Sequence, residues 1–165
     1  MLFKACKKTA VKGGPGRICT TQTGWAYNIE EMPDPVFADK VLGDGVCIVP
    51  RGKQVCSPVC GTVGNVSEAG HAFSIRGDDG VEVMIHIGVD TIKMPSGTFR
   101  ASVRAGQAVQ QGDILCHADI KAIKKAGYAT HTAILLVNTK EFEIVERQLG
   151  RTKRRKSIVF TYRKL

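Results

Sequence analysis

The segment Ser67–Ile92, SEAGHAFSIRGDDGVEVMIHIGVDTI, constrains the fold more than any other part of the chain. Asp79 and Gly80 form a strong turn dipeptide, and the residues on both sides alternate or run apolar, as strands do. The segment therefore predicts a β-hairpin. His71 and His86 stand on either side of the turn, so the hairpin can bring both imidazoles to one region of a sheet face. Two adjacent neutral imidazoles can act as nucleophile and donor, bind a metal as a pair, or pack in a core.

From residue 34 onward, short apolar segments alternate with turn residues, which is typical of an all-β sandwich or barrel-like body. One short helical stretch is expected at Ile120–Ala126, with Ile120 and Ile123 facing inward. The predicted strands are Gly45–Val49, Gln54–Ser57, Gly61–Val66, Ala72–Arg76, Glu82–His86, Ala108–Val109, Ile114–Asp119, Thr132–Val137 and Ile158–Tyr162.

Residues 1–33 are predicted to form a basic, largely irregular head, and residues 34–165 a single β-sandwich domain. The run Gly13–Gly16 (GGPG) breaks any regular element, and no helical period continues across it. At 165 residues the chain is long enough for one domain with its own core. Its longest apolar runs have the length of strands, and we expect no membrane span. With no secretory signal in view either, a cytoplasmic protein is expected.

The formal net charge of +9 is concentrated at the ends of the chain. Residues 34–149 hold 12 Lys/Arg and 13 Asp/Glu, whereas residues 150–165 hold seven Lys/Arg and no acid. The run Lys153–Lys156 (KRRK) fits either an arm for an anionic partner or a solvated turn before a last strand. The turn is the preferred interpretation. No aromatic residues interleave the run, and no nucleic-acid partner is expected.

Two further motifs carry little chemistry by themselves. Val103–Leu115 repeats valine or leucine and glycine at three-residue spacing, a turn pattern of biotinyl and lipoyl carriers, duplicated-hybrid-motif peptidases and sugar-transport phosphocarriers. No lysine stands where a biotinyl or lipoyl carrier would need it. Cys56 and Cys60 form a lone C-x3-C with no second pair at zinc-finger spacing.

Several blocks follow one another in an order that resembles a known family. They are Asp34–Val46, Ser57–Gly64, His71–Ile75, Gly80–Ile92, Val103–Leu115 and Thr132–Asn138. Together they closely resemble the glucose-type enzyme IIA of the bacterial phosphoenolpyruvate-dependent sugar phosphotransferase system, over about residues 34–162. The most specific part is His-x3-Asp-Thr, starting at His86, together with the His-Ala-Phe-Ser-Ile block fifteen residues upstream.

The resemblance implies a flattened antiparallel β-sandwich of the duplicated hybrid motif type, with one or two short helical turns. It implies that His86 is phosphorylated and that His71 assists it. His86 would attack phosphorus through Nε2 while His71 donates an N–H to the phosphoryl oxygens. We expect Asp90 near this site, where its carboxylate would tune transfer. A turn-capping role for Asp90, paired with Thr91, is an equally good interpretation.

The chain departs from the family pattern at four places. The threonine that usually precedes the assisting histidine by two residues is replaced by Ala69, and the bulky apolar residue four before it by Ser67. The aspartate of the Pro-x-Asp-Gly block is Cys60, and the family's Thr-Pro reads Thr132-Ala133. The family's docking face suits a basic phosphocarrier, whereas this chain ends in a basic tail. Partner recognition is thus the property most exposed to these changes.

Three functions remain open from the residues. The first, which we favour, is a phosphotransferase that receives phosphate on His86 from a histidine phosphocarrier protein and passes it to the IIB domain of a membrane sugar permease. It would act as a monomer, peripheral to the membrane, without a required cofactor. The second is a regulatory or docking protein in which His71 and His86 share a zinc ion with a partner. The third is a zinc hydrolase, which would need a downstream His-x-His where the chain has Thr130-His131-Thr132.

Overall fold

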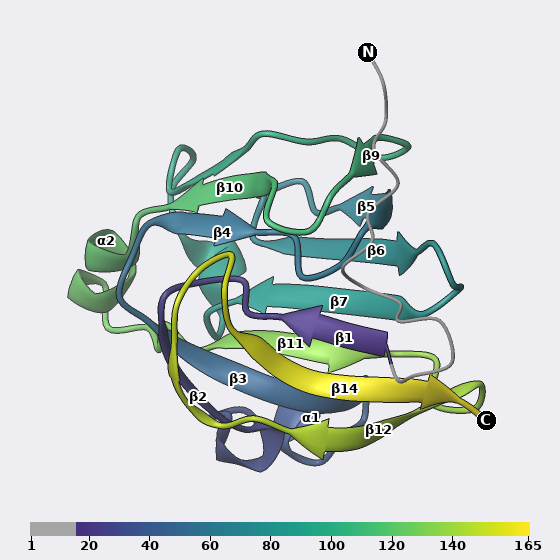
Figure 1. Cartoon of the computed structure of the whole chain (residues 1–165). Coiled ribbons are helices and arrows are strands. Elements are labelled where there is room, and N and C mark those ends of the chain that lie inside the picture. Colours follow the sequence, from purple (N-terminus) through teal and green to yellow (C-terminus); the bar gives the residue numbers. More distant parts are fainter. Residues whose placement is uncertain (1–15) are drawn as a thin grey trace.

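The computed structural model describes residues 16–165, and strands dominate this part of the chain (Figure 1). Short helical segments occupy η1 (Ile29–Glu31), α1 (Pro35–Ala38), η2 (Thr91–Lys93) and α2 (Ile120–Lys125). The strands are β1 (Gly16–Cys19), β2 (Gly24–Asn28), β3 (Asp44–Pro50), β4 (Gln54–Cys56), β5 (Gly61–Val66), β6 (Ala72–Gly77), β7 (Glu82–Ile87), β8 (Phe99–Ala101), β9 (Ala108–Val109), β10 (Ile114–Ala118), β11 (Thr132–Leu136), β12 (Phe142–Arg147), β13 (Gly150–Thr152) and β14 (Ile158–Lys164).

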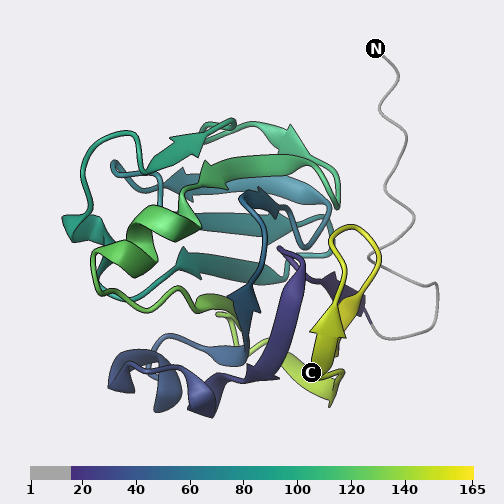
Figure 2. The same ribbon diagram turned by 90° about the vertical axis from the view of Figure 1, so that its left-hand side faces the viewer.

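The described strands form one large antiparallel sheet and two small ones. The large sheet has eight strands in the order β13-β2-β3-β11-β7-β6-β5-β9, and the small sheets have the orders β1-β14-β12 and β4-β10-β8. Two views at right angles show the short helices at the periphery of this body (Figures 1 and 2). The flattened, open sheets make the fold a β-sandwich, which confirms the predicted fold class.

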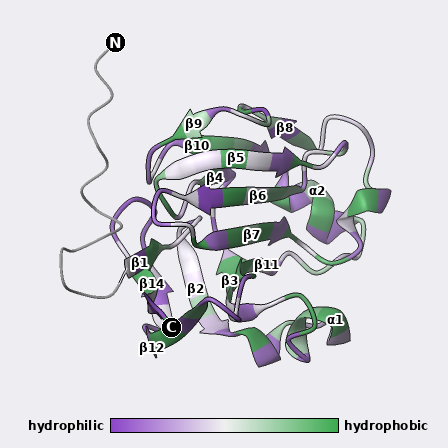
Figure 3. Cartoon of the chain, turned by 90° about the vertical axis from the view of Figure 1, so that its right-hand side faces the viewer, coloured by the Kyte–Doolittle hydropathy of each residue, from purple (hydrophilic) through white to green (hydrophobic). Residues whose placement is uncertain are grey.

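The main core lies between the large sheet and the two small sheets. Inward residues of the large sheet, such as Ile48, Ile85 and Ile134, share one buried cluster with Leu115 and Phe160 of the small sheets. Figure 3 shows apolar colouring along β6 and β7 and polar colouring over much of the connecting loops. Because side chains alternate across a strand, the neighbours of these inward residues must face the outside of the large sheet.

A second, smaller buried cluster covers part of that outer face. It contains Phe37 of α1 and Cys47, Ala133 and Leu135 of β3 and β11, together with residues of the η1 segment. Helix α1 begins where the Asp34 carboxylate accepts a hydrogen bond from the N–H of Val36 at 3.0 Å, with Pro35 in the first turn. The short helix thereby holds Phe37 over the middle of the sheet.

The strands predicted from residue 34 onward are confirmed, with ends that differ by at most two residues. The Asp79-Gly80 turn joins β6 to β7, and Gly80 has a φ of 94°, which favours glycine. Helix α2 buries Ile120 and Ile123 as expected. The basic run is a turn before the last strand, as preferred.

The predicted irregular head is wrong for residues 16–33, while residues 1–15 lie outside the described part of the chain. Strand β1 pairs with β14 at the other end of the sequence, and β2 pairs with both β3 and β13. Both strands are short, and each pairs with a strand that lies far away in the sequence, so their local residue pattern does not predict them. The sandwich therefore begins well before residue 34.

None of the helices in residues 16–165 has the length and hydrophobicity that crossing a lipid bilayer requires.

Candidate functional site

His86 lies on the outer face of the large sheet. Its register places it opposite Ala72 of β6 on one side and Ala133 of β11 on the other. Ala133 in turn faces Cys47 of β3, and Cys47 faces Tyr27 of β2. Directly opposed residues share a face in an antiparallel sheet, so these side chains form one row across the outside of the sandwich.

His71 reaches His86 from just outside the hairpin. It precedes β6 by one residue, and its carbonyl accepts a hydrogen bond from the N–H of Ile87 at 2.8 Å. Strict alternation would send this side chain to the other face, but the chain leaves the strand here. The two imidazole rings meet edge to face, with centroids 5.0 Å apart and an interplanar angle of 89°. The predicted approach of the two histidines is thus seen in the structure.

The backbone selects the tautomer of His86. Its Nδ1 lies 2.8 Å from the carbonyl oxygen of Gly88. Because a carbonyl oxygen can only accept a hydrogen bond, Nδ1 must carry the proton in the neutral ring, and Nε2 retains its lone pair. Nε2 is therefore the ring nitrogen of His86 with an available lone pair.

A serine lies at Nδ1 of His71 and allows the opposite tautomer in this ring. Ser67 Oγ accepts a hydrogen bond from the N–H of Ala72 at 3.0 Å and lies 3.1 Å from Nδ1 of His71. The Ser67 hydroxyl hydrogen is left to point at Nδ1, and in that arrangement both the hydroxyl and the ring nitrogen have a partner. In the tautomer that accepts this hydrogen bond at Nδ1, Nε2 of His71 bears the hydrogen beside the His86 ring.

Apolar rings surround the pair and keep it neutral. The ring centroid of Phe37 lies 5.0 Å from that of His86, and the centroid of Phe99 lies 5.9 Å from that of His71. Burial lowers the pKa of His86, against smaller opposing effects of the Gly88 hydrogen bond and nearby carboxylates. Burial also lowers the pKa of His71, and the neighbouring His86 adds to this effect. Both rings are therefore neutral at pH 7.

Two carboxylates act on His86 from outside the pair. Asp90 is exposed, has a left-handed φ of 58°, and makes no side-chain hydrogen bond to cap η2. Thr91 instead donates its hydroxyl hydrogen to the carbonyl of Ile87 at 2.5 Å. The interpretation of Asp90 as a capping residue paired with Thr91 is therefore wrong. The expected position of Asp90 near the site agrees with its electrostatic effect, which raises the pKa of His86. Asp34 makes a larger contribution of the same sign.

The other two histidines stand apart from this arrangement. His117 lies on β10, opposite Arg100 and Gln54 in one of the small sheets. His131 is half-buried beside Gly88, and burial lowers its pKa. Within residues 16–165, no three His, Cys, Asp or Glu side chains come together as a metal site would require.

Sequence reasoning missed four contributors to this site. Ser67 was noted only for differing from the family pattern, and its contact with His71 depends on how the loop closes. Phe37, Phe99 and Asp34 were not singled out. The Asp-Pro pair before α1 was a readable signal for that helix. Nothing in the local sequence indicated that this helix lies against His86.

The site defines a class of protein. A rigid sheet presents one neutral imidazole with a free Nε2 lone pair and a second imidazole placed to donate beside it. Such a pair suits a group that is carried on histidine and passed onward, since transfer of this kind asks mainly for alignment and charge stabilisation.

Comparison with known proteins identifies the family. A family model described as phosphoenolpyruvate-dependent sugar phosphotransferase system, EIIA 1, matches residues 16–142. A glucose-specific EIIA component of that system from Bacillus anthracis is 38% identical over 151 residues, which cover 92% of each chain. The glucose-specific EIICBA component from Streptococcus pneumoniae is 41% identical over 115 residues, 70% of this chain and 16% of that protein.

A solved structure agrees with these sequence matches. The glucose permease IIA from Mycoplasma capricolum superimposes with a TM-score of 0.84 at 27% identity, covering 92% of this chain and 98% of that one. The chain therefore belongs to the EIIA 1 family of the phosphoenolpyruvate-dependent sugar phosphotransferase system. Its role is that of a phosphocarrier in sugar phosphotransfer.

Proposed function

We propose that this phosphocarrier holds its phosphoryl group on Nε2 of His86, with His71 as the assisting donor. One observation carries the proposal: the Gly88 carbonyl holds the proton of His86 on Nδ1 and so leaves Nε2 as the free base. The edge-to-face contact with His71 supports the second role, because it brings a second imidazole close to the ring that would carry the phosphoryl group.

The transfer balances without a cofactor. The Nε2 lone pair attacks phosphorus, an Nε2–P bond forms, and the P–N bond of a phosphohistidine donor breaks, with its electron pair returning to the donor imidazole. The proton of His86 stays on Nδ1, hydrogen-bonded to the Gly88 carbonyl, and offsets part of the incoming negative charge. The Nε2–H of His71 stabilises the phosphoryl oxygens as charge spreads over them. In the reverse sense, the same atoms release the group to an acceptor.

The surroundings of the two histidines favour passing the phosphoryl group on over keeping it. A phosphoryl group that leaves aqueous solvent loses hydration, and the exposed carboxylate of Asp90 repels it. Asp34 acts in the same sense, since it also favours a positive charge on His86. We propose that these two carboxylates keep the phosphorylated form easy to discharge.

We propose a histidine phosphocarrier protein as the donor and a IIB domain of a sugar permease as the acceptor. The name EIICBA, carried by the Streptococcus pneumoniae relative, supports the acceptor, because it joins B and A components in one protein. A shared zinc ion is less well supported. His71 and His86 could offer two nitrogen ligands, yet residues 16–165 supply no third, so such an ion would depend on a partner.

Phosphate mapping tests the proposal. The protein would be incubated with phosphoenolpyruvate, enzyme I and the histidine phosphocarrier, and acid-labile phosphate would be located in wild type and in His86→Ala, His71→Ala and His117→Ala. We expect label on His86 in wild type and none in His86→Ala. His71→Ala should accept label slowly and release it poorly to a IIB domain, whereas His117→Ala should behave as wild type. Undiminished labelling of His86→Ala would overturn the assignment.

A further inference from the structure

A basic groove with two aromatic rings lies on the outer face of the large sheet, at its β13-β2-β3 end. We call it the Trp25 groove and define it by Trp25, Tyr27, Arg51, Arg151 and Lys153. It has a volume of about 690 Å³. Trp25 is 45% exposed and Tyr27 is 37% exposed, which is unusual for large aromatic side chains.

Strand register explains why these side chains share one surface. Trp25 lies opposite Arg151 of β13 and opposite Val49 of β3. Arg51 and Lys153 follow directly after the ends of β3 and β13, and both line the groove beside Val49 and Arg151. Ala26, between the two aromatic residues, is buried in the main core. The aromatic rings therefore face outward because side chains alternate along β2.

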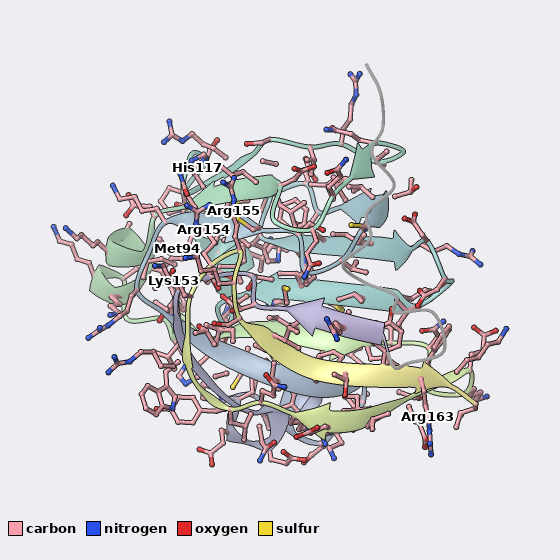
Figure 4. All side chains as sticks on the ribbon, in the orientation of Figure 1. Met94, His117, Lys153, Arg154, Arg155 and Arg163 are labelled. Atoms are coloured by element: carbon pink, nitrogen blue, oxygen red, sulfur yellow. The ribbon has the colours of Figure 1, made fainter. Side chains whose placement is uncertain are left out.

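The loop that carries Lys153 is held against the groove. The N–H of Arg154 donates to Thr23 Oγ1 at 3.1 Å, and Nε of Arg155 donates to the carbonyl of Gly112 at 3.0 Å. Figure 4 shows Lys153, Arg154 and Arg155 following one another along the connection between β13 and β14. Hydrogen bonds thus fix a part of the basic run that sequence alone presented as a solvated turn.

The positive charges of the groove have no acidic partner in the described chain. None of the residues that line it is Asp or Glu. The ion pairs found among residues 16–165 involve Lys40, Arg147 and Arg163 and none of Arg51, Arg151 and Lys153. Exposed, unpaired guanidinium groups beside aromatic rings bind carboxylates well, because the planar guanidinium of Arg donates two parallel hydrogen bonds to one carboxylate.

The groove lies on the same face of the large sheet as the histidine site, with the η1 and α1 segments covering the strands between them. Tyr27 stands in the same cross-sheet row as His86, with β3 and β11 between them. Three strand spacings of about 4.8 Å place its backbone roughly 14 Å from that of His86. A protein interface of ordinary size covers about 800 Å² on each partner, a patch roughly 16 Å in radius, so a protein centred over His86 reaches Tyr27 at the near edge of the groove, and a somewhat larger interface covers the rest.

We propose that the Trp25 groove binds an acidic segment of the protein that exchanges phosphate with His86. The proposal rests on the proposed function and adds the chemistry of the partner: a carboxylate-rich flank beside its phosphoryl-exchanging side chain. Trp, Tyr and Arg are the residues most enriched in protein–protein hot spots, which favours a protein over other polyanions. Charges at such a rim act mainly on the association rate, and salt weakens their effect.

Charge reversal tests this inference. The variant Arg51→Glu/Arg151→Glu/Lys153→Glu would be compared with Lys121→Glu/Lys124→Glu/Lys125→Glu, which reverses three exposed cations on α2. Both variants change the net charge equally and leave the histidines intact. Because the phosphocarrier is expected to be basic, the acidic partner is the IIB domain, and we expect the groove variant to lower the rate of transfer from His86 to that domain about tenfold at low salt and to abolish its salt dependence. The α2 variant should stay within roughly twofold of wild type.

Binding can be followed at the groove itself, because Trp25 is the one tryptophan of the chain. Its fluorescence should change on mixing with the partner in wild type and in the α2 variant, and much less in the groove variant. Thermal unfolding of both variants shows whether they remain folded. The single variant Arg151→Glu gives a milder change should the triple variant fail to fold. If both triple variants slow transfer equally, or if neither slows it, the groove is not the docking site. Normal endpoint labelling of His86 in those variants would leave the proposed function in place. Absence of His86 labelling in wild type overturns both.

Discussion

At the scale of single residues, the site depends on giving two identical side chains opposite proton arrangements. His86 has a carbonyl at Nδ1, which can only accept. His71 has a hydroxyl at Nδ1, and that hydroxyl already accepts from a backbone N–H. His86 is thereby left with a lone pair at Nε2, and His71 bears a hydrogen there when its Nδ1 accepts from the Ser67 hydroxyl. The Ser67 hydroxyl takes the position-holding role that the family resemblance assigns to a threonine where this chain has Ala69.

Ser67→Ala should slow phosphoryl transfer through His86 without preventing it. Loss of the hydroxyl frees the Nδ1 of His71 and lets its ring populate both tautomers, so the donor is present only part of the time. We expect a rate about tenfold lower, in the range typical for a lost positioning hydrogen bond, with full labelling at long times. Rapid-quench kinetics with the phosphorylated donor would measure it.

Nitrogen-15 NMR of the imidazoles separates this role from a general loss of stability. In wild type, His71 should show a protonated Nε2 and a bare Nδ1, and Ser67→Ala should show averaged shifts. Ser67→Thr, which keeps the hydroxyl, should restore both the spectrum and most of the rate. If the His71 shifts do not respond to Ser67→Ala, the serine does not set the tautomer.

The pH dependence of transfer follows from the lowered pKa of His86. Protonation removes the Nε2 lone pair, and burial makes protonation harder than for an ordinary histidine, whose pKa is 6.5. The rate of phosphate acceptance should therefore stay constant from pH 8 down through 6.5 and fall only at lower pH. Phe37→Ala, which exposes the ring, should move the inflection upward. An inflection above 6.5 in wild type would contradict the burial argument.

At the scale of elements, the connection from β7 to η2 sets the orientation of the His86 ring. Gly88 has a φ of 76°, and its carbonyl turns back to His86 Nδ1. An added Cβ at this position would meet the side chain of Thr91 and the carbonyl oxygen of Ala129. The hairpin sets the distance between the histidines, and this tight glycine turn sets the orientation of the ring that reacts.

Gly88→Ala should reduce both stability and transfer. The left-handed backbone costs about 1 kcal/mol for a residue with a side chain, and the contacts with Thr91 and Ala129 add about 1–3 kcal/mol. We expect unfolding free energy to fall by roughly 3 kcal/mol in urea titrations. Gly97→Ala is the matched control, because Gly97 also has a positive φ, 91°, but meets nothing within 4 Å of an added Cβ. Equal losses in the two variants would show that crowding at Gly88 is unimportant.

The elements that sequence reasoning anticipated are those whose signals are local. The hairpin around Asp79-Gly80 combines a turn dipeptide with apolar alternation, and α2 shows its buried Ile120 and Ile123 at helical spacing. Strands β1 and β13 are short and depend on partners far along the chain. Helix α1 has only four residues. Such elements exist because tertiary contacts hold them, so propensity alone does not reveal them.

At the scale of the whole molecule, three buried or half-buried histidines link stability to pH. Burial lowers the pKa of His71, His86 and His131 in the folded state. Below pH 6.5 the unfolded chain therefore binds more protons than the folded one, and acid favours unfolding. The stabilisation is complete above 6.5 and is lost as the pH falls toward the lowered folded-state values.

Urea titrations between pH 7.5 and 5.5 should thus show a falling free energy of unfolding. This range lies above the titration of ordinary carboxylates, so histidines account for the change. The variant His71→Gln/His86→Gln should have a flatter profile over the same range. A wild-type profile that rises toward pH 5.5 would contradict the sign of these shifts.

The central claim is that one atom, Nε2 of His86, carries the phosphoryl group. Phosphorylated protein with nitrogen-15 histidine would be examined by NMR for the nitrogen that couples to phosphorus. We predict coupling to Nε2 of His86, with Nδ1 still bearing a proton that exchanges slowly because the Gly88 carbonyl holds it. Coupling to Nδ1 of His86, or to any nitrogen of His71, would contradict the account.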